Sequence, residues 1–146
     1  MSYYDFSTDT STLCVFDLES MKHRFYDDAD WWSIQRDALL EMNNGNVAFI
    51  SLPEDGDYSF SIIDEIFEPS IEVNLNAPSG HLFIGAGEEV TSDELEPECV
   101  RGGIFLDLKP GKYTLKARVE NQIIFISFCA AVDSVNTFNK NVNLEW

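Results

Sequence analysis

The chain has few basic side chains. Nine lysine and arginine residues stand against 26 aspartate and glutamate residues, so the formal net charge is −17 over 146 residues. A charge of this size repels phosphate backbones and anionic lipid, and it attracts basic proteins. The composition therefore argues against binding to nucleic acid or to a membrane, and it makes a basic protein the expected partner.

Cysteine and histidine are also scarce, with three cysteines and two histidines. Cys14 and Cys129 lie in apolar runs, where a free thiol behaves as a small hydrophobic side chain. The odd number suits a reducing compartment, and no Cys-x-x-Cys pair or Cys/His cluster is present. We expect a cytoplasmic protein with no zinc site and no cofactor. Calcium stays open, because oxygen ligands are abundant although the spacing of an EF-hand is missing.

Long hydrophobic runs and linkers are missing as well. The longest apolar stretch, 123–132, covers ten residues and is interrupted by Ser127, which is about half of what a membrane-spanning helix needs. No cationic segment followed by an apolar stretch opens the chain, so we expect no signal peptide. No Pro-, Gly- and Ser-rich segment divides the sequence, so residues 1–146 are expected to form a single domain.

What the sequence does contain is hydrophobic side chains, at 45% of all residues, arranged mostly in short alternating runs. Gly, Pro and Asn separate these runs, which favours an antiparallel β-sandwich, jelly-roll-like, of about eight strands. The expected strands are 12–18, 47–52, 58–63, 71–75, 82–86, 103–108, 112–119, 123–130 and 142–144. Asp55 and Gly56 suit a tight turn, so 47–52 and 58–63 are expected to pair as a hairpin.

One segment, 30–44, has helical spacing instead. Its apolar residues recur at steps of three and four, which predicts a short amphipathic α-helix. Asp30 is placed to cap the N-terminus of this helix, and Gly45 is placed to end it. The apolar positions are Trp31, Ile34, Ala38, Leu39 and Met42.

A short pattern occurs twice, as Gly56-x-Tyr58 and as Gly111-x-Tyr113. Each copy follows an apolar run and starts an expected strand. Two interpretations stay open. The copies are either similar hairpins in the two sheets, or independent uses of Gly to relieve a turn and of Tyr to fill the rim of a core.

The negative charge is uneven. Residues 1–100 hold 22 acidic and three basic side chains, whereas residues 101–146 hold four and six. Two interpretations stay open: the negative charge only keeps the protein soluble, or it forms an acidic face that docks on a basic protein. Segment 88–98 is expected to be an exposed acidic loop.

Adjacent helical side chains diverge by about 100°, so Trp31 and Trp32 are not expected to face one core together. The predicted partner-binding residues are Asp27, Asp28, Asp30, Trp32, Glu88, Glu89, Asp93, Glu94, Glu96 and Glu98.

Lys22, His23 and Arg24 form the only basic cluster in the first hundred residues. The carboxylates of Asp27, Asp28 and Asp30 follow after a short gap. We expect Arg24 to pair with these acids and to fix the loop that leads into the helix.

Several short motifs in roughly the first 65 residues resemble an uncharacterised family of small bacterial proteins. They are His23-Arg24, Asp30-Trp31-Trp32-Ser33, Glu41, Gly45-Asn46-Val47-Ala48-Phe49 and Asp55-Gly56-x-Tyr58. The resemblance implies a bacterial origin and supplies no active site. More loosely, the chain is similar in charge and size to acidic immunity proteins, which neutralise the toxins of neighbouring cells.

The leading hypothesis is therefore a non-catalytic acidic binding protein, an immunity-type inhibitor of a basic bacterial toxin. A first alternative is a carbohydrate- or small-ligand-binding sandwich that uses Trp31 and Trp32 or a tyrosine-lined concavity. A second is a hydrolase with paired carboxylates. No catalytic residue is predicted, because no Gly-x-Ser-x-Gly elbow occurs and neither His23 nor His81 lies in a recognisable motif. The sequence does not determine the oligomeric state.

Overall fold

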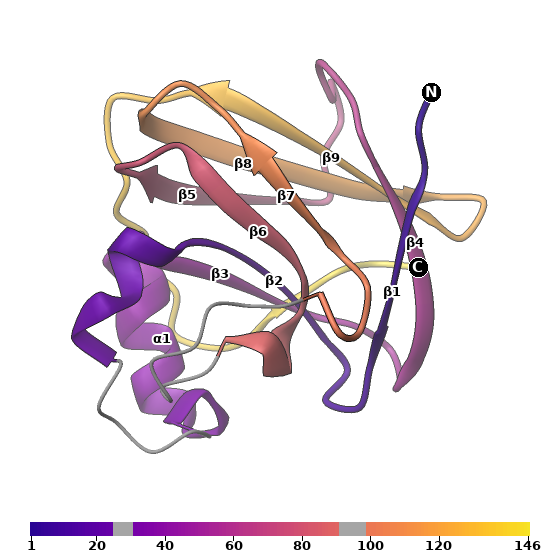
Figure 1. Ribbon diagram of the computed structural model, residues 1–146, viewed down its shortest axis with the longest axis horizontal. Helices are drawn as coiled ribbons and strands as arrows, with labels where there is room; N and C mark the ends of the chain where they lie inside the picture. Colours follow the sequence, from indigo (N-terminus) through magenta and orange to yellow (C-terminus); the bar gives the residue numbers. More distant parts are fainter. Residues whose placement is uncertain (25–30, 91–98) are drawn as a thin grey trace.

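The computed structural model describes residues 1–24, 31–90 and 99–146. Two five-stranded sheets pack face to face (Figure 1). The first sheet has the order β1 (Tyr4–Thr8), β4 (Gly56–Ile62), β9 (Ile123–Ala130), β8 (Gly111–Glu120) and β5 (Ile71–Ala77). The second has the order β10 (Val142–Asn143), β3 (Val47–Ser51), β2 (Thr12–Asp17), β6 (His81–Ala86) and β7 (Ile104–Asp107). The predicted mostly-β sandwich is confirmed, with parallel pairing only between β4 and β9 and between β10 and β3 among the named strands.

The main core lies between the two sheets. Alternate side chains of each strand point inward, among them Val73 and Leu115 from the first sheet and Val15 and Ile84 from the second, all of them fully buried. A second apolar cluster covers the outer face of the second sheet. There Phe16 and its neighbours pack beneath the α-helix and the adjoining 3-10 turns. The second sheet is thus covered on both faces.

Two strand predictions need correction. A strand, β1, precedes the run expected to be the first one, which brings the described strands to ten. The predicted hairpin is wrong, because β3 pairs with β2 and β10 whereas β4 pairs with β1 and β9 in the other sheet. Hydrophobic and polar residues alternate in the same way whether two strands pair in one sheet or face each other across a core. The sequence pattern therefore did not show that the chain crosses from one sheet to the other between β3 and β4. Residues 52–55 therefore bridge the two sheets at one end of the sandwich.

The helix is shorter than predicted. A 3-10 turn, η2 (Trp31–Ser33), precedes α1 (Gln35–Asn43), and Ile34 between them is extended with φ −85° and ψ 111°. Ile34 is the N-cap residue, so the prediction that Asp30 caps this helix is wrong. The predicted end is confirmed, because Gly45 has a φ of 75° just beyond α1. No helix in the described segments is long and apolar enough to cross a bilayer.

Gly45 is expected to be intolerant of any side chain. A Cβ atom added there would lie 1.9 Å from the backbone oxygen of Ser134, at a backbone angle that favours glycine. Gly45→Ala should lower the free energy of unfolding by about 2 kcal/mol, measured by chemical denaturation. Gly111→Ala is the control, because its nearest such contact is 4.0 Å away. Equal stability of the two variants would contradict the packing described for Gly45.

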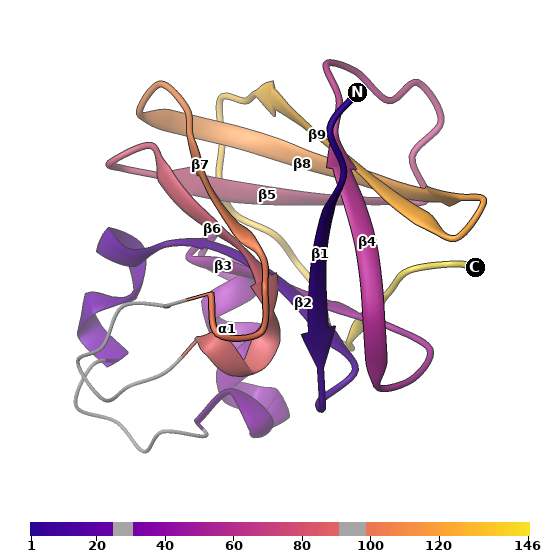
Figure 2. The ribbon, with the colours of Figure 1, turned by 45° about the vertical axis from the view of Figure 1, so that its right-hand side comes forward.

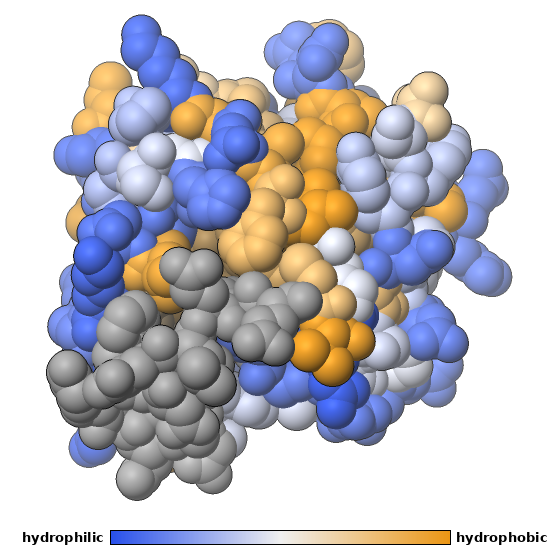
Figure 3. Space-filling model, in the orientation of Figure 1, coloured by the Kyte–Doolittle hydropathy of each residue, from blue (hydrophilic) through white to orange (hydrophobic). Residues whose placement is uncertain are grey.

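Hydrophobic side chains gather in the middle of one face, over β7 and the chain next to it (Figure 3). Phe105 on β7 is 40% exposed, and the ring of His81 stacks on it with 4.7 Å between centroids. His81 Nδ1 also lies 2.5 Å from Asp107 Oδ1. β7 is an edge strand of only four residues bordered by this polar pair, and such short edges limit unwanted strand pairing.

Candidate functional site

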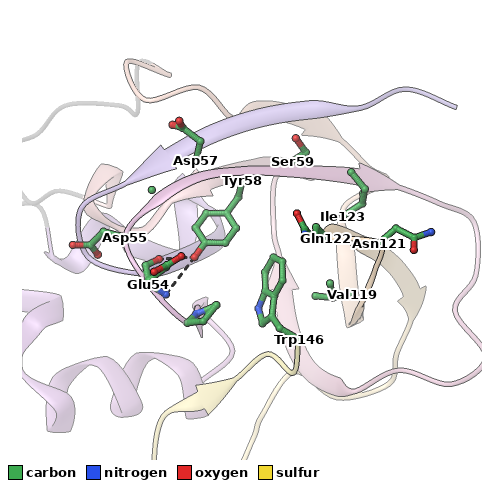
Figure 4. Close-up of a pocket in the computed structure, with 12 residues that line it drawn as sticks. Glu54, Asp55, Asp57, Tyr58, Ser59, Val119, Asn121, Gln122, Ile123 and Trp146 are labelled. Carbon is green, nitrogen blue, oxygen red and sulfur yellow. Dashed lines mark hydrogen bonds between the residues drawn. The ribbon is translucent and has the colours of Figure 1, made fainter.

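An open cleft lies at the end of the sandwich where the chain crosses between the sheets (Figure 4). It encloses about 920 Å³ and is lined by residues 53–59, 119, 121–123 and 146. We call it the acidic cleft. Its walls come from the β3–β4 crossover with the start of β4, from the β8–β9 turn and from the last residue described. Figure 2 shows this end of the chain next to β4 and the β8–β9 turn.

Strand pairing brings these three segments together. Ser59 on β4 is opposite Ile123 on β9, so the β8–β9 turn lies beside the start of β4. The turn consists of Asn121 and Gln122, whose φ values of 51° and 66° suit a two-residue hairpin of type I′. On the other side, β10 pairs with β3, and the backbone N–H of Leu144 donates to Ser51, which directs the following residues to the cleft.

Two aromatic rings form one wall of the cleft. The ring centroids of Tyr58 and Trp146 are 5.4 Å apart, and Tyr58 also stacks on the buried Phe6 at 5.7 Å. The Tyr58 hydroxyl donates to the backbone oxygen of Glu54 at 2.5 Å, which fixes the ring against the crossover. Trp146 remains 47% exposed. The Tyr58 ring is therefore held in place by Phe6 and Glu54, whereas the Trp146 ring is accessible to solvent.

The repeated Gly-x-Tyr pattern has a structural explanation. The Tyr113 hydroxyl donates to the backbone oxygen of Lys109, just as Tyr58 donates to that of Glu54. Both tyrosines start strands of the same sheet, on either side of β9, so the suggestion of hairpins in two different sheets is wrong. Each tyrosine fastens the turn before its strand.

The acidic cleft carries negative charge without compensation from its own lining. Glu54, Asp55 and Asp57 are all exposed, and no lysine, arginine or histidine among the described residues lines the cleft. Asp55 accepts a hydrogen bond from the hydroxyl of Ser11 at 2.5 Å. Within the described parts of the chain, no basic side chain forms an ion pair with any of the three carboxylates. The site thus offers a negative potential next to an exposed indole ring.

The negative charge continues beyond the cleft on the side of Val119 and Trp146, whereas the hollow on its other side, which shares Asp57, Tyr58 and Ser59 with the cleft, is also lined by Arg101. Val119 and Trp146 also line a second hollow, which reaches Glu68 and Arg118, and these two residues in turn line a third hollow beside Phe67. Phe67 is 84% exposed. We call the three hollows together the acidic surface. Its acidic residues are Glu54, Asp55, Asp57, Glu65, Glu68, Glu120 and Glu145, and Arg118 supplies the one basic side chain among its described lining residues.

Most of the predicted partner-binding residues lie outside the described residues. These are Asp27, Asp28, Asp30, Asp93, Glu94, Glu96 and Glu98. Trp32 is described and is partly buried against the cluster beneath α1, with its indole nitrogen buried. Trp31 beside it is only 3% exposed. The two rings are therefore not an open stacking platform, because both pack in or against the apolar cluster beneath α1.

Glu88, predicted to be part of an exposed loop, instead pins a turn. Its carboxylate accepts hydrogen bonds from the Thr8 and Thr10 hydroxyls at 2.8 and 3.0 Å and from the Asp9 backbone at 2.6 Å. Only 14% of its side chain is exposed, and Arg101 lies 3.5 Å away. The hydrogen bond from Arg101 to Asp9 raises the pKa of that guanidinium. Glu88 thus joins the β1–β2 turn to the chain after β6.

Glu89 lies in the same 3-10 turn, η3 (Gly87–Glu89), near two cysteines. Burial raises the pKa of the Cys14 thiol well above its usual value, and the negative charges of Glu89 and Glu88 add to the effect. The Cys14 thiol donates to the backbone oxygen of Ala86 at 3.3 Å. All three cysteines are free. Cys14 behaves as the buried hydrophobic side chain that the sequence predicted.

A buried ion cluster lies beneath α1 and uses residues of the motifs noted in the sequence. Glu41 is 2% exposed, and its carboxylate accepts hydrogen bonds from Arg24 Nε at 2.7 Å and from Asn46 Nδ2 at 2.8 Å, while His23 Nε2 lies at 2.8 Å. Burial disfavours the charged form of Glu41, but the hydrogen bonds from Asn46, Arg24 and His23 outweigh it and lower the pKa. The Arg24 guanidinium also lies 4.6 Å from the centre of the Trp31 ring.

The partners predicted for Arg24, at positions 27–30, lie outside the described residues. Its described partners on α1, Glu41 and Asp37, were not predicted, because they are 17 and 13 positions away along the chain. The spacing of Glu41 on the amphipathic helix gave no sign that its carboxylate is buried. Across the described ranges, no group of three His, Cys, Asp or Glu side chains is arranged to hold a metal ion.

Comparisons with known proteins place the chain in a family and relate its fold to two solved structures. The model of DUF6386, a family of unknown function, matches residues 1–144. No curated protein matches the sequence. ComJ from Bacillus subtilis, an inhibitor of the DNA-degrading activity of NucA, has a similar structure with a TM-score of 0.51 at 9% identity, over 90% of this chain and 96% of ComJ. The protein named crocagin biosynthetic gene J gives 0.54 at 14% identity, over 89% and 99%. At these identities the likeness concerns the fold alone.

Proposed function

Since this chain belongs to the DUF6386 family of unknown function, we propose its role from the acidic surface: it is a non-catalytic protein that binds a basic protein and inhibits it. The observation that carries the proposal is an extended acidic surface whose described lining has a single basic side chain, Arg118, and two exposed aromatic side chains, Trp146 and Phe67. Aromatic side chains supply much of the binding energy at protein interfaces, and complementary charge accelerates the encounter.

The kind of partner follows from charge. A protein that handles nucleic acid presents lysine and arginine side chains to phosphates. An acidic protein that covers those side chains competes with the nucleic acid for the same site. ComJ inhibits a DNA-degrading activity, and the shared fold supports, without transferring, an inhibitory role for this chain. We propose a basic bacterial toxin, of the nuclease class, as the partner.

The predicted acids at positions 27–30 and 93–98 stay predictions for the same interface. Glu88 is already engaged by the β1–β2 turn, so we assign it a structural role in the proposal. The three free cysteines fit a reducing compartment, and we propose an intracellular place of action.

The first alternative function, binding of a carbohydrate or another small ligand, is limited to fewer places on the molecule. Trp31 is buried, so a sugar has no stacking platform at Trp31 and Trp32. The concave wall of Tyr58 and Trp146 keeps a carbohydrate or small ligand as the second candidate function. A hydrolase with paired carboxylates receives no such support, since Glu54, Asp55 and Asp57 are exposed and a general acid needs a desolvated carboxyl group.

The proposal is tested by capturing the partner from lysate of the native host on the immobilised chain and purifying it. We expect a protein of basic isoelectric point whose own activity, DNA degradation for a nuclease, falls to background at an equimolar amount of this chain. The gene beside the one for this chain is the first candidate. A captured protein that is acidic, or one that keeps its full activity when saturated, would overturn the proposal.

A further inference from the structure

We infer that the hollow beside Phe67 holds an apolar side chain of the basic partner, while lysine or arginine side chains next to it in the partner pair with glutamates at the edge of the hollow. We call it the Phe67 hollow. It has a volume of about 390 Å³ and is lined by residues 1, 63, 65–68, 118, 120 and 125. The inference rests on the proposed function in that the basic partner supplies this segment, and it names the part of the partner that is recognised.

The first support is the apolar part of the lining. Ile63, directly after β4, and Phe125 on β9 are half-buried, and Ile66 is only 3% exposed. The pairing of β4 with β9 brings these segments side by side. Removing apolar surface from water is favourable, so a concave lining of this kind favours an apolar group over a polar one.

The second support is the way in which Phe67 is presented to solvent by the connection between β4 and β5 (Figure 2). At 84% it is the most exposed aromatic side chain of the described residues, although Ile66 before it is buried. The backbone N–H groups of Ile63 and Ser70 donate to β9 and β8 at 2.9 and 3.0 Å, and Arg118 donates to a backbone oxygen of the connection at 3.3 Å. Its neighbours are therefore fixed, and a preorganised aromatic side chain beside a hollow is typical of a binding hot spot.

The third support is charge, which selects the kind of segment that fits. Glu65, Glu68 and Glu120 line the hollow, and the one basic side chain among its described lining residues, Arg118, already lies 3.7 Å from Glu120. A membrane with anionic lipid, or a second copy of this chain at a net charge of −17, would bring further negative charge to the hollow. A segment in which lysine or arginine flanks an apolar side chain brings complementary charge.

The test uses the whole chain and short peptides, observed by NMR at the backbone amides of residues 63–68 and of Phe105. The probe acetyl-Lys-Arg-Leu-Arg-Lys-amide should shift the amide signals of 63–68 in a saturable way and leave that of Phe105 unchanged. Acetyl-Lys-Arg-Ser-Arg-Lys-amide has the same charge without the apolar side chain, and it should bind at least about tenfold more weakly. Acetyl-Glu-Asp-Leu-Asp-Glu-amide keeps the leucine and reverses the charge, and it should not bind.

Matched variants locate the apolar contact. Phe67→Ser should weaken binding of the leucine peptide about tenfold, because it removes the ring beside the hollow. Phe105→Ser removes another exposed ring, on β7, and should leave the affinity within about twofold. Phe67 is so exposed that the variant should keep its fold, which the remaining amide signals report.

The contribution of charge has its own control. Glu65→Gln combined with Glu68→Gln should weaken the leucine and serine peptides by the same factor, about fivefold, because both peptides carry the same charge. Glu19→Gln combined with Glu72→Gln removes an equal charge elsewhere and should leave both affinities within about twofold.

Several results would overturn the inference. Equal affinities for the leucine and serine peptides would mean that charge alone attracts them. Equal losses for Phe67→Ser and Phe105→Ser, or no saturation up to about 20 mM peptide, would remove the Phe67 hollow as the site. Amide shifts of 63–68 that follow the concentration of the chain without peptide would identify a second copy as the occupant.

The result is separable from that for the proposed function. If the leucine peptide does not bind while a basic partner is still inhibited, the inference fails and the proposed function stands. If the peptide binds at the Phe67 hollow but no basic protein is inhibited, the proposed function fails and the recognition of an apolar side chain with basic neighbours stands.

Discussion

Glu41→Ala is expected to lower the free energy of unfolding by about 3–5 kcal/mol, because it removes the anion from a buried ion cluster. The Glu41 side chain is 3% exposed and that of Arg24 is 14% exposed, so water replaces little of what is lost. Asn46, Arg24 and His23 all direct hydrogen bonds or charge to this one carboxylate, from η1 (Leu18–Arg24) and from the segment after α1. Chemical denaturation of the two proteins measures the difference.

The pH dependence gives an independent check. The folded-state pKa of Glu41 is lowered from its ordinary value, so its contribution to stability is complete above the unfolded-state pKa and is lost as the pH falls through the folded-state pKa. The gap between the wild-type protein and Glu41→Gln should therefore be largest near neutral pH and shrink in acid. Glu72→Gln, an exposed neighbour of Lys116 at 3.9 Å, is the control and should change little. A loss below about 1 kcal/mol for Glu41→Ala would show that the cluster is not structural.

The second large effect is expected at Trp146. Trp146→Ala should weaken binding of the inhibited partner about 30-fold or more, as is typical of an aromatic hot spot at the centre of an interface. The change should leave stability nearly intact, since the side chain is 47% exposed. The affinity of the purified partner is measured by calorimetry. Phe105→Ala, a 40% exposed aromatic side chain on β7, is the control, and an equal loss for both variants would remove Trp146 from the interface.

The strands were largely predictable because each run alternates in hydrophobicity. The pairing of those strands was not predictable in the same way. β3 and β4 follow each other with a turn-forming Asp55 and Gly56 between them, yet they belong to different sheets. β3 and β4 would bury the same side chains whether they paired as a hairpin in one sheet or lay in two facing sheets. The local sequence pattern therefore cannot distinguish these two arrangements. The start of α1 was missed because the 3-10 turn at Trp31 continues the helical spacing.

The candidate site was harder to predict than the fold. Sequence analysis favoured the densest acidic segments, whereas the acidic surface collects carboxylates that are sparse along the chain, such as Glu54, Glu120 and Glu145. Trp146 reaches Tyr58 only because β10 pairs with β3. The one sequence feature that pointed to this site was the repeated Gly-x-Tyr pattern. It singled out Tyr58 but did not indicate that Trp146 is its aromatic partner. Residues brought together by long-range pairing leave no local pattern.

The role of the acidic surface is tested most directly by the rate of association with the purified partner as a function of salt. Two triple variants carry the same net charge: Glu54→Gln with Asp55→Asn and Asp57→Asn in the cleft, and Glu19→Gln with Glu72→Gln and Asp133→Asn elsewhere. The wild-type rate should fall at least about tenfold between 50 and 500 mM salt, and the cleft variant should associate more slowly at low salt with a shallower dependence. The other variant should stay close to the wild-type protein. Rates that are insensitive to salt, or equal for the two variants, would contradict a partner-binding role for the acidic surface.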